Sequence, residues 1–547
     1  MAPDPDGSDS RPRLPVAQLS ILAICRLAEP MSLTSVYPYL PEMIESFNVP
    51  PNEVGKWAGI ISAIFSLAQA CTAISWGRAS DRFGRKPMIL IAMTCAMTSS
   101  LLFGLSKSIW WAILARGLSG ASAGNVGILR TAVAEMVPQK ELQPRAFSTM
   151  PLVGQFGTAL GPIIGGSLAS PVKNLPAIFG NSKFFAKYPY LLPNLASGVM
   201  FTCGILVGWL FLRESLETKK YQRDYGREIG NSIVRCVKRG KGHNDSRGDY
   251  EALDFNNSTR KRKQNIKATP VSYRSIFTYN TNLVLATYFI LAFHQVAYDQ
   301  LLPVFLHLPV NRENMSLPFK FSGGFGLESG RIGLLFTLYG AWCTFAQFTI
   351  FPPIVNRYGL VACLRWATAL HSFTIMITPF TVLMPNTFLQ QSSILLTLFA
   401  KSLGGIFVFP GLTILLTNSA SSLQVLGTLN GIATTTAAIG RAFGPFIAGQ
   451  TFTWSIGAGY IVAAFWLLAF VSLGGHVLMY FIVNGDGFSS AVSTKEMEVE
   501  ESIKMVQRSV DGNDDLSDEV MGLLDTDSED DSMEDKLSVE EGIAMKI

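Results

Sequence analysis

Charged residues are scarce in this 547-residue chain: Asp, Glu, Lys and Arg make up 15% of it, against 48% hydrophobic residues. Soluble domains carry about 25% charged residues, so this composition excludes a soluble multidomain enzyme and a wholly disordered protein. The five histidines have no metal-ligand spacing, and no glycine-rich loop followed by Lys and Ser or Thr is present. We therefore expect no metal, no cofactor, no ATP-driven step, no catalytic constellation of an enzyme and no nucleic-acid partner.

Cysteine is also rare, with seven residues and no CxxC pair. A secreted scaffold held by disulfides is therefore excluded. Six of the seven lie inside apolar runs: Cys25, Cys71, Cys95, Cys203, Cys343 and Cys363.

Long apolar runs are the main feature that the chain does have. A helix that crosses a bilayer needs about 20 apolar residues. The first run lacks a small-residue cleavage site, so we interpret it as a retained helix and not as a signal peptide. The sequence predicts an all-α membrane protein with twelve transmembrane helices, near residues 15–40, 54–76, 87–106, 109–133, 145–169, 190–212, 282–306, 330–352, 359–383, 391–417, 425–450 and 457–483.

Two long polar stretches lie outside these runs, one between the sixth and seventh runs and one after the twelfth. Residues 214–280 are rich in basic residues, whereas residues 495–547 hold 18 acidic and 5 basic residues, a net charge of −13. High charge and few apolar residues favour disorder in both stretches. We predict a six-helix bundle at 1–213, a mostly disordered basic linker at 214–280, a second six-helix bundle at 281–483 and a mostly disordered acidic tail at 484–547.

The positions of Lys and Arg predict the orientation of the chain. The loop after the second apolar run holds Arg78, Arg82, Arg85 and Lys86, and Arg357 lies in the corresponding loop of the second half. Short loops rich in Lys and Arg stay in the cytosol. We therefore expect a multi-pass protein with both termini in the cytosol. The sequence leaves open whether it lies in the plasma membrane or the vacuolar membrane, and we expect it to be a monomer.

Three segments of the first half recur in the second half, in the same order and at nearly one offset. Parallel six-helix repeats are typical of transporters, whose solute site lies between the halves near the middle of the membrane. The pairs are Asp81–Gly84 with Asn356–Gly359, Leu114–Gly120 with Phe399–Gly405, and Gly157–Gly166 with Gly440–Gly449. The last pair aligns Gly161 and Pro162 with Gly444 and Pro445.

The loop between the second and third runs carries the densest motif. Its glycines permit a tight turn and its basic residues favour the cytosolic face. The order of its residues resembles the signature loop of the major facilitator superfamily, which implies the major facilitator fold. The resemblance also implies that Asp81 caps the N-terminus of the helix at 425–450 when the cytosolic side closes, within a charge network. The motif residues are Gly77, Asp81, Arg82, Gly84, Arg85 and Lys86.

The run at 145–169 is rich in glycine. Small residues at this spacing let helix backbones approach closely, and a proline inside a helix removes a hydrogen bond and allows a bend. Ordinary helix packing is one interpretation of this pattern. The pattern also resembles the antiporter signature of the drug:proton antiporter branch of the superfamily, on residues Gly157, Gly161, Pro162, Gly165 and Gly166.

Basic residues inside the predicted spans are costly in a bilayer and are candidates for function. Arg116 is similar in position to a family motif in which an intramembrane Arg takes part in proton transfer. Ser119 and Ser122 replace the Gln and Gly that the family often has there. A structural ion pair or a side chain that reaches the interface is the alternative. Lys401 and Arg441, in the second half, carry the same two interpretations.

Acidic residues inside the spans are fewer. Glu29 lies near the predicted midplane, three residues after Arg26, and Asp299 lies in the outer half of its run, five residues after His294. We regard Glu29 as the first candidate for proton coupling and Asp299 as the second, with Arg116, Arg26 and His294 assisting. Arg26 and Glu29 at this spacing could instead neutralise one another on one helix face, and His294 could be a hydrogen-bonded structural residue.

Within the superfamily, the segment from Arg116 to Glu217 resembles the tetracycline-resistance and zinc-induced-facilitator-like group. Zinc chemistry is not supported, because the Cys-Pro-Gly-Cys segment and the histidine-rich loop of the plant proteins are absent. The resemblance implies a secondary transporter that exports small organic molecules or drugs in exchange for protons by alternating access. Its partners would be solute, proton and lipid. The alternatives are a solute sensor on the same scaffold that does not transport, and an uptake or vacuolar transporter of one metabolite.

The acidic tail holds short motifs for other partners. Glu519, Leu523 and Leu524 fit an acidic dileucine sorting signal, and Ser528 and Ser532 are followed by acids, as acidophilic kinases prefer. Sorting adaptors and kinases are therefore candidate partners of the tail, and a plain solvated acidic segment is the alternative.

The predicted orientation has a direct test in the two glycosylation sequons. Asn314-Met-Ser316 lies in a loop that the charge rule places outside or in the lumen, whereas Asn257-Ser-Thr259 lies in the cytosolic linker. Glycosidase should increase the gel mobility of the wild-type protein and of Asn257→Gln, and leave Asn314→Gln unchanged. A shift that depends on Asn257 would invert the orientation.

Overall fold

The computed structural model describes residues 14–137, 143–216, 219, 222–240, 277–311, 316, 318–419 and 423–482. These residues are almost entirely helical, and the β-bridges among them are isolated, at Ser316–Lys320 and Phe321–Tyr460. The sequon residues Asn257 and Asn314 and the sorting residues Glu519, Leu523 and Leu524 lie outside the described residues, so the predictions made for them stay predictions.

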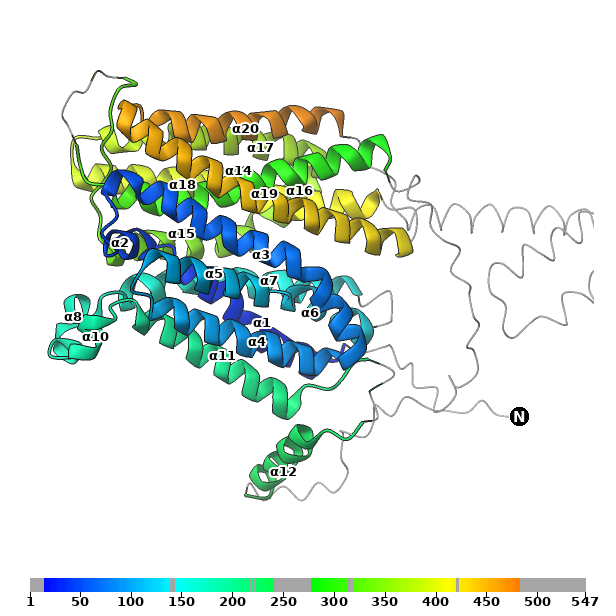
Figure 1. The fold of residues 1–547 in the computed structure, drawn as a ribbon. Coiled ribbons are helices and arrows are strands. Elements are labelled where there is room, and N and C mark those ends of the chain that lie inside the picture. The colour runs from blue at the N-terminus through cyan, green and yellow to red at the C-terminus, as the bar shows by residue number, and fades with distance from the viewer. Residues whose placement is uncertain are drawn as a thin grey trace, which may run out of the picture.

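The chain forms two bundles that lie side by side, the first blue to green and the second green to orange in Figure 1. The main helices of the first half are α1 (Val16–Ser35), α3 (Val54–Phe83), α4 (Arg85–Gly104), α5 (Ile109–Ser122), α6 (Asn125–Met136), α7 (Gln143–Leu168) and α11 (Leu191–Phe211). Those of the second half are α14 (Tyr279–His307), α15 (Ser329–Thr349), α16 (Phe351–Tyr358), α17 (Leu360–Ile377), α18 (Thr387–Asn418), α19 (Leu423–Ala458) and α20 (Val462–Phe481).

Short elements connect these helices. Most of them lie at one end of the bundle, which we call the Glu42 end, and the opposite end is the Gly84 end. The short elements are α2 (Leu40–Glu45), η1 (Pro51–Glu53), α8 (Pro171–Asn174), α9 (Pro176–Phe179), α10 (Lys183–Lys187) and η3 (Thr378–Leu383). A further helix, α12 (Tyr225–Gly240), lies within the segment predicted to be a mostly disordered linker, and the sequence analysis did not anticipate it.

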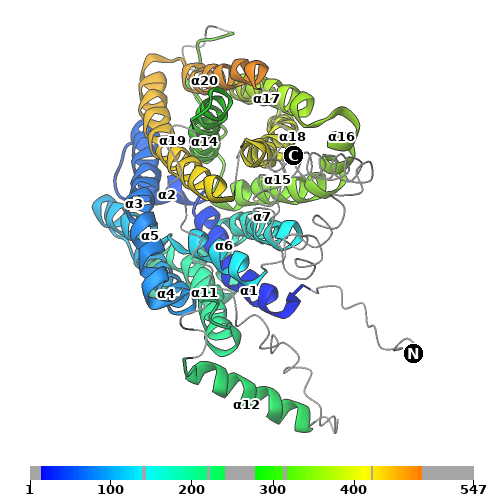
Figure 2. The same ribbon diagram turned by 90° about the vertical axis from the view of Figure 1, so that its right-hand side faces the viewer.

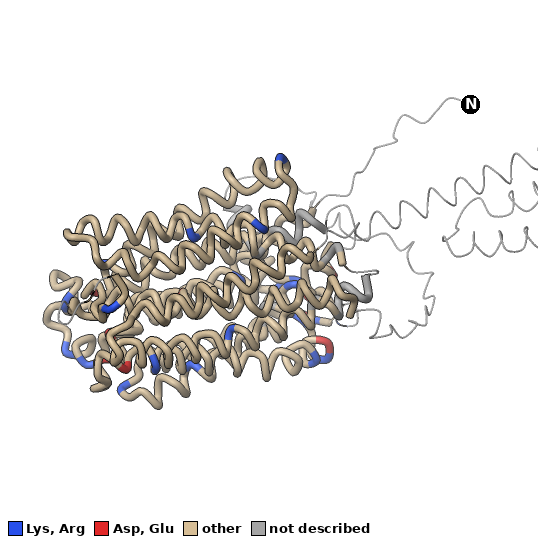
Figure 3. The backbone as a smooth tube through the Cα atoms, turned by 90° about the horizontal axis from the view of Figure 1, so that it is seen from above, with Lys and Arg blue, Asp and Glu red and all other residues tan. Residues whose placement is uncertain are grey.

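The bundle has the dimensions of a membrane protein. Nine helices among the described residues are long and apolar enough to cross a bilayer. Three further segments run the length of the bundle. The first is α5 together with α6, the second is α7 and the third is α19; the apolar part of α7 is Leu152–Leu168. Charged residues are few along the helices, as the mostly tan tube in Figure 3 shows. The arrangement confirms an all-α membrane fold and is consistent with twelve passes.

Glycines of the repeated motif bring the helices into contact in the same way in both halves. A Cβ atom at Gly161 of α7 would overlap the α1 backbone at Met31, and one at Gly444 of α19 would overlap the α14 backbone at Phe293. Between the halves, α7 approaches α15 where Gly166 lies against Gly333. The motif therefore positions each half internally and also holds the two halves together.

We predict that Gly161→Ala and Gly444→Ala each lower the stability of the bundle. A methyl group at either position meets backbone, which cannot yield easily, and overpacking costs about 1–3 kcal/mol. Gly474→Ala in α20 is the matched control, because nothing lies within 4 Å of its Cβ position. Thermal unfolding in detergent should show a lower midpoint for the first two variants and an equal or higher one for the control. Equal midpoints for all three would contradict the packing role.

Candidate functional site

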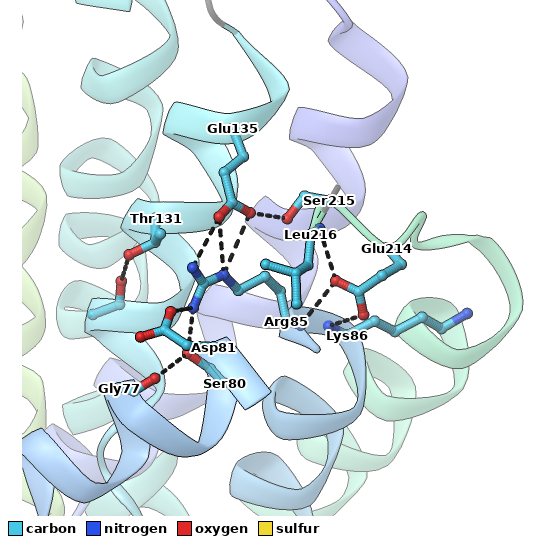
Figure 4. Close-up of polar contacts among 11 residues, drawn as sticks. Gly77, Ser80, Asp81, Arg85, Lys86, Thr131, Glu135, Glu214, Ser215 and Leu216 are labelled. Carbon is cyan, nitrogen blue, oxygen red and sulfur yellow. Dashed lines mark hydrogen bonds and ion pairs between the residues drawn. The ribbon is translucent and has the colours of Figure 1, made fainter. Parts of the chain in front are cut away.

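The loop between α3 and α4 forms a charged network at the Gly84 end (Figure 4). The Arg85 guanidinium forms ion pairs with Asp81 at 2.6 Å and with Glu135 of α6 at 2.9 Å. The Ser215 hydroxyl donates to the same Glu135 carboxylate at 2.6 Å. Arg85 is buried whereas Asp81 is 66% exposed, so Arg85 is the centre of the network and Asp81 is at its edge.

Glu214 closes the other side of this loop. Its carboxylate accepts the backbone N–H groups of Arg85 at 2.8 Å and of Lys86 at 3.1 Å, which are the first residues of α4. These N–H groups have no partner inside the helix, and the positive end of the helix dipole also stabilises a carboxylate there. Gly84 makes the turn possible, because its φ is +107° and a Cβ atom there would lie 2.6 Å from a Glu214 oxygen.

The sequence predicts Asp81 and the basic residues of this network, but it does not connect Glu135 and Glu214 to them. Glu135 and Glu214 lie 50 and 129 residues from Arg85 in sequence, so only the fold brings them to the loop. The useful signal was the excess of basic residues in the loop, since a buried Arg needs a carboxylate partner. Arg82 stacks over Phe83 at 5.6 Å. Capping of the 425–450 helix by Asp81 stays a prediction.

A cavity with a mainly apolar wall and a few polar side chains lies inside the first half, between α1, α3, α4, α5 and α11. It contains about 540 Å³ of space between atoms, part of which is open to solvent. Glu29 and Arg116 both line this cavity, so the structure brings together two residues that the sequence analysis named separately. Polar neighbours in its wall are Ser32, Ser100, Ser119, Ser122 and Asn194.

Arg26 and Glu29 form an ion pair on α1 at 2.7 Å. Their side chains are 17% and 16% exposed, so the pair is largely but not fully withdrawn from solvent. Removing one member of a buried pair leaves an uncompensated charge, which typically costs about 3–5 kcal/mol. The predicted neutralisation of the two side chains is thus present in this conformation, and Glu29 also faces a cavity.

Arg116 has a different environment from the other buried cations. Its guanidinium lies over the Phe103 ring at 4.8 Å and the Phe65 ring at 5.8 Å, and the residue is 8% exposed. Within the described part of the chain it forms neither a hydrogen bond nor an ion pair. Cation–π contacts only partly offset the loss of water. The Arg116 N–H groups therefore line the cavity without an acceptor among the described residues.

The second half contains a buried ion pair of its own. The Lys401 ammonium of α18 lies 3.1 Å from the Asp299 carboxylate of α14 and 4.4 Å from the centre of the Tyr298 ring. Gln295 donates to the second oxygen of Asp299 at 2.8 Å. Lys401 is 1% exposed, whereas the Asp299 side chain is 29% exposed, so the carboxylate is the accessible member of the pair.

Two histidines lie next to this pair. The rings of His294 on α14 and His371 on α17 are 5.1 Å apart, and the Nδ1 atom of His294 lies 2.6 Å from the Ile290 carbonyl oxygen. Neither ring nitrogen of the buried His371 has a hydrogen-bond partner among the described residues. The sequence analysis missed His371, because a lone histidine in an apolar run carries no signal until the fold brings another polar group to it.

The two halves place their charges by the same rule. The acids Glu29 and Asp299 lie on α1 and α14, the first long helix of each half, and the bases Arg116 and Lys401 lie at the matching positions of α5 and α18. In the second half acid and base pair directly, whereas in the first half Arg26 takes the acid and leaves Arg116 without a partner. Arg441 on α19 lies within electrostatic range of Arg130, which belongs to the first half.

Polar contacts between the halves gather toward the Glu42 end in the described part of the chain. Glu42 accepts the backbone N–H of Ser329 at 2.7 Å, and Glu45 lies 3.1 Å from His307. Lys173 forms a 2.9 Å ion pair with Glu328, and its hydrogen bond and charge hold the pKa of Glu328 below the ordinary value. Nearer the middle, the Ser62 hydroxyl donates to Gln300.

The helices between the halves follow the same pattern. α3 lies against α19 where Gly55 meets Phe452 and Gly59 meets Pro445, and the two helices diverge toward the Gly84 end in Figure 1. The contacts therefore close the Glu42 end.

Comparison with known proteins gives this arrangement a family. Residues 22–319 match the family model of the Major Facilitator Superfamily. The chain is 35% identical to a major facilitator superfamily multidrug transporter, mfsB of Aspergillus fumigatus, over 87% of this chain and 85% of that protein. It is 28% identical to the protein ZINC INDUCED FACILITATOR 1 of Arabidopsis thaliana, over 86% of this chain and 89% of that protein.

Solved structures agree on the fold. The nucleoside transporter NupG matches with a TM-score of 0.55 and 11% identity, over 84% of this chain and 99% of that one. A bacterial homolog of the human lysosomal transporter Spinster, in an inward-facing conformation, matches with a TM-score of 0.55 and 14% identity, over 85% and 96%. At these identities the likeness shows the major facilitator fold alone. The family model and the Aspergillus relative show more: the chain belongs to the major facilitator superfamily.

Proposed function

We propose that the protein exports small organic molecules or drugs in exchange for protons by alternating access. Its relatives include the multidrug transporter already described and an efflux pump, azaK of Aspergillus niger, which is 31% identical over 37% of this chain and 41% of that protein. In this proposal the Gly84 end and both termini face the cytosol, and the Glu42 end faces the outside or a vacuolar lumen. The proposal also keeps the predicted domain boundaries, which divide the chain after residues 213, 280 and 483.

The observation that carries the proposal is the position of Glu29. Its carboxylate lines the same cavity as Arg116 and also forms the ion pair with Arg26 at 2.7 Å. A coupling group has to lose its proton on one side of the membrane and regain it on the other. A carboxylate that pairs with Arg26 when ionised and releases it when protonated changes the charge that the cavity presents.

Exchange requires that solute and proton exclude one another. A solute group that donates hydrogen bonds to Glu29 favours its ionised form, so solute binding and protonation compete for the same carboxylate. The neighbouring Arg116 and the serine hydroxyls supply further donors for an acceptor on the solute. Loading the cavity with solute from the cytosol would therefore expel the proton, and protonation from the other side would expel the solute.

The contacts between the halves support access from the cytosol in this conformation. The Glu42 end is held by Glu42, Glu45 and Lys173, while Asp81 at the Gly84 end is 66% exposed and pairs within its own loop. In the proposed cycle, closure of the Gly84 end brings Asp81 to the N-terminus of α19 and breaks the contacts at the Glu42 end. In the same step, opening of the Glu42 end would expose the Asp299–Lys401 pair as a second charged group.

Glu29→Gln should abolish accumulation that is driven by a pH gradient, yet permit solute exchange between compartments of equal pH. Gln keeps the shape of the side chain and removes its titration. Asp299→Asn should impair accumulation less, because Glu29 still carries the proton. The measurement is flux in reconstituted vesicles with an imposed pH gradient, using a solute found by a growth screen on cells that lack or overproduce the protein.

Protein amount and thermal stability have to be measured in parallel for both variants, because Glu29→Gln leaves the Arg26 guanidinium, and Asp299→Asn the Lys401 ammonium, without its carboxylate. Full pH-driven flux in the Glu29→Gln protein would remove Glu29 from the mechanism and leave it as the structural partner of Arg26.

Asp81→Asn should slow turnover while leaving solute affinity unchanged. Asn can still accept a hydrogen bond, but it lacks the negative charge that pairs with Arg85. In the closed state that charge would also interact favourably with the positive N-terminal end of the α19 dipole. Glu53→Gln, which removes a carboxylate at the other end of α3, is the control. Initial rates at saturating and limiting solute separate the two effects, and weakened binding with unchanged turnover would contradict the gating role.

A further inference from the structure

The helix α12 lies outside the two bundles. It follows the last pass of the first half and rests beside the end of α11, as Figures 1 and 2 show from two directions. Nothing in the transport cycle proposed above requires it. Its sequence is nevertheless amphipathic, with apolar residues on one side and basic residues on the other. An amphipathic helix normally has its apolar face covered, so we expect a partner on this face.

One edge of the apolar side is already occupied. Gly226 and Gly230 are buried, and a Cβ atom at these positions would overlap the backbone carbonyls of Trp209 and Leu210 in α11. The two helices are thus in backbone contact at the Gly84 end. A further tie precedes α12, where Asp224 forms an ion pair with Lys86 at 2.6 Å. These contacts fix the position of α12 relative to the membrane passes.

The rest of the apolar side is uncovered. Tyr225, Ile229 and Ile233 recur every fourth residue, so they share one face of the helix. They are 64%, 46% and 46% exposed, and Trp209 at the adjoining end of α11 is 41% exposed. This face therefore continues the lipid-facing surface of α11.

The opposite side of α12 is basic. Arg227 and Arg235 lie away from the apolar face, and by sequence the helix also contains Lys238 and Arg239 against a single acid, Glu228. That acid pairs with Arg223 just before the helix, at 2.9 Å, which leaves the net positive charge of the helix in place. Lys and Arg on the polar side of an amphipathic helix are typical of helices that lie in the interface of a membrane containing anionic lipids.

We propose that α12 is a membrane-surface helix that binds anionic phospholipids of the cytosolic leaflet. The Tyr225, Ile229 and Ile233 face enters the boundary between headgroups and acyl chains, and the basic side contacts the lipid phosphates. The inference uses the proposed orientation of the chain, because the cytosolic leaflet is the one rich in anionic lipid. It does not depend on proton coupling or on the solute.

Lipid fits this face better than a protein partner does, for two reasons on the helix itself. The apolar face adjoins the lipid-facing Trp209 at the end of a transmembrane helix, where acyl chains end and headgroups begin. The basic side also matches the phosphate layer in charge. Through Asp224 and Lys86, a lipid-held α12 would in addition steady the loop that contains Asp81 and Arg85.

The test measures the membrane depth of α12 in the full-length protein. A variant without the seven native cysteines receives one nitroxide label, at Ile233→Cys on the apolar face or at Asn231→Cys on the polar face. The protein is reconstituted in vesicles of phosphatidylcholine, with or without phosphatidylserine. Collision rates with oxygen, which concentrates in the acyl region, and with a water-soluble nickel complex report the depth of each label. The cysteine-free parent must first elute as a monodisperse species.

In phosphatidylserine vesicles we expect oxygen collisions to be several-fold more frequent at position 233 than at 231, and nickel collisions to show the reverse order. Arg227→Gln with Arg235→Gln should reduce this difference, as should omission of phosphatidylserine. Equal accessibility of the two labels to nickel would overturn the proposal. A label at 233 shielded from both reagents would overturn it too, since it would indicate a protein partner or a second copy on this face.

Discussion

A charge inside a bundle of apolar helices has to be compensated within the bundle, and this constraint organises the polar groups of the protein. Lys401 meets it directly through Asp299, at 3.1 Å and with almost no exposure. Arg85 meets it at the membrane edge through Asp81 and Glu135. Arg116 does not meet it and has only aromatic rings beside it. The cavity next to Arg116 is therefore the place where a bound molecule would lower the electrostatic cost.

Glycine contacts make the second contribution, because they bring the helix backbones within each half into direct contact. Backbone contact between α1 and α7, and between α14 and α19, fixes each half as a unit. The contacts between the halves are of a different kind, since they consist largely of short polar bridges and glycine crossings toward the Glu42 end. Hydrogen bonds of this kind contribute about 0.5–1.5 kcal/mol each, so a few of them can be exchanged for others in a conformational change.

The Gly84 loop connects these two features to the surface of the membrane. Glu214 fixes the start of α4, Arg85 connects the loop to α6, and Lys86 reaches Asp224 ahead of α12. These contacts connect the loop that carries Asp81 to α4, to α6 and to the residue that precedes α12. In the proposed transport cycle, and with α12 on the membrane surface as proposed, the loop is placed to respond both to the relative movement of the halves and to lipid.

The sequence by itself determined the elements whose information is local or repeated. Run length and charge scarcity indicate the membrane helices, since the bilayer sets both. The order of residues from Gly77 to Lys86 and the duplicated glycine motif indicate the family and the two halves, because a glycine contact needs only a glycine at the right spacing. The helix α12 was missed, although the four-residue spacing of Tyr225, Ile229 and Ile233 was visible.

Only the tertiary structure decided which charges meet. Arg26 and Glu29 are three residues apart, so their pairing was foreseeable, whereas Asp299 and Lys401 are 102 residues apart. Glu214 reaches the Gly84 loop across 129 residues and His371 reaches His294 from another helix. Such pairs depend on which face of each helix turns inward. That is a property of the packed bundle, because an apolar helix carries little polar pattern by which its inward face could be identified beforehand.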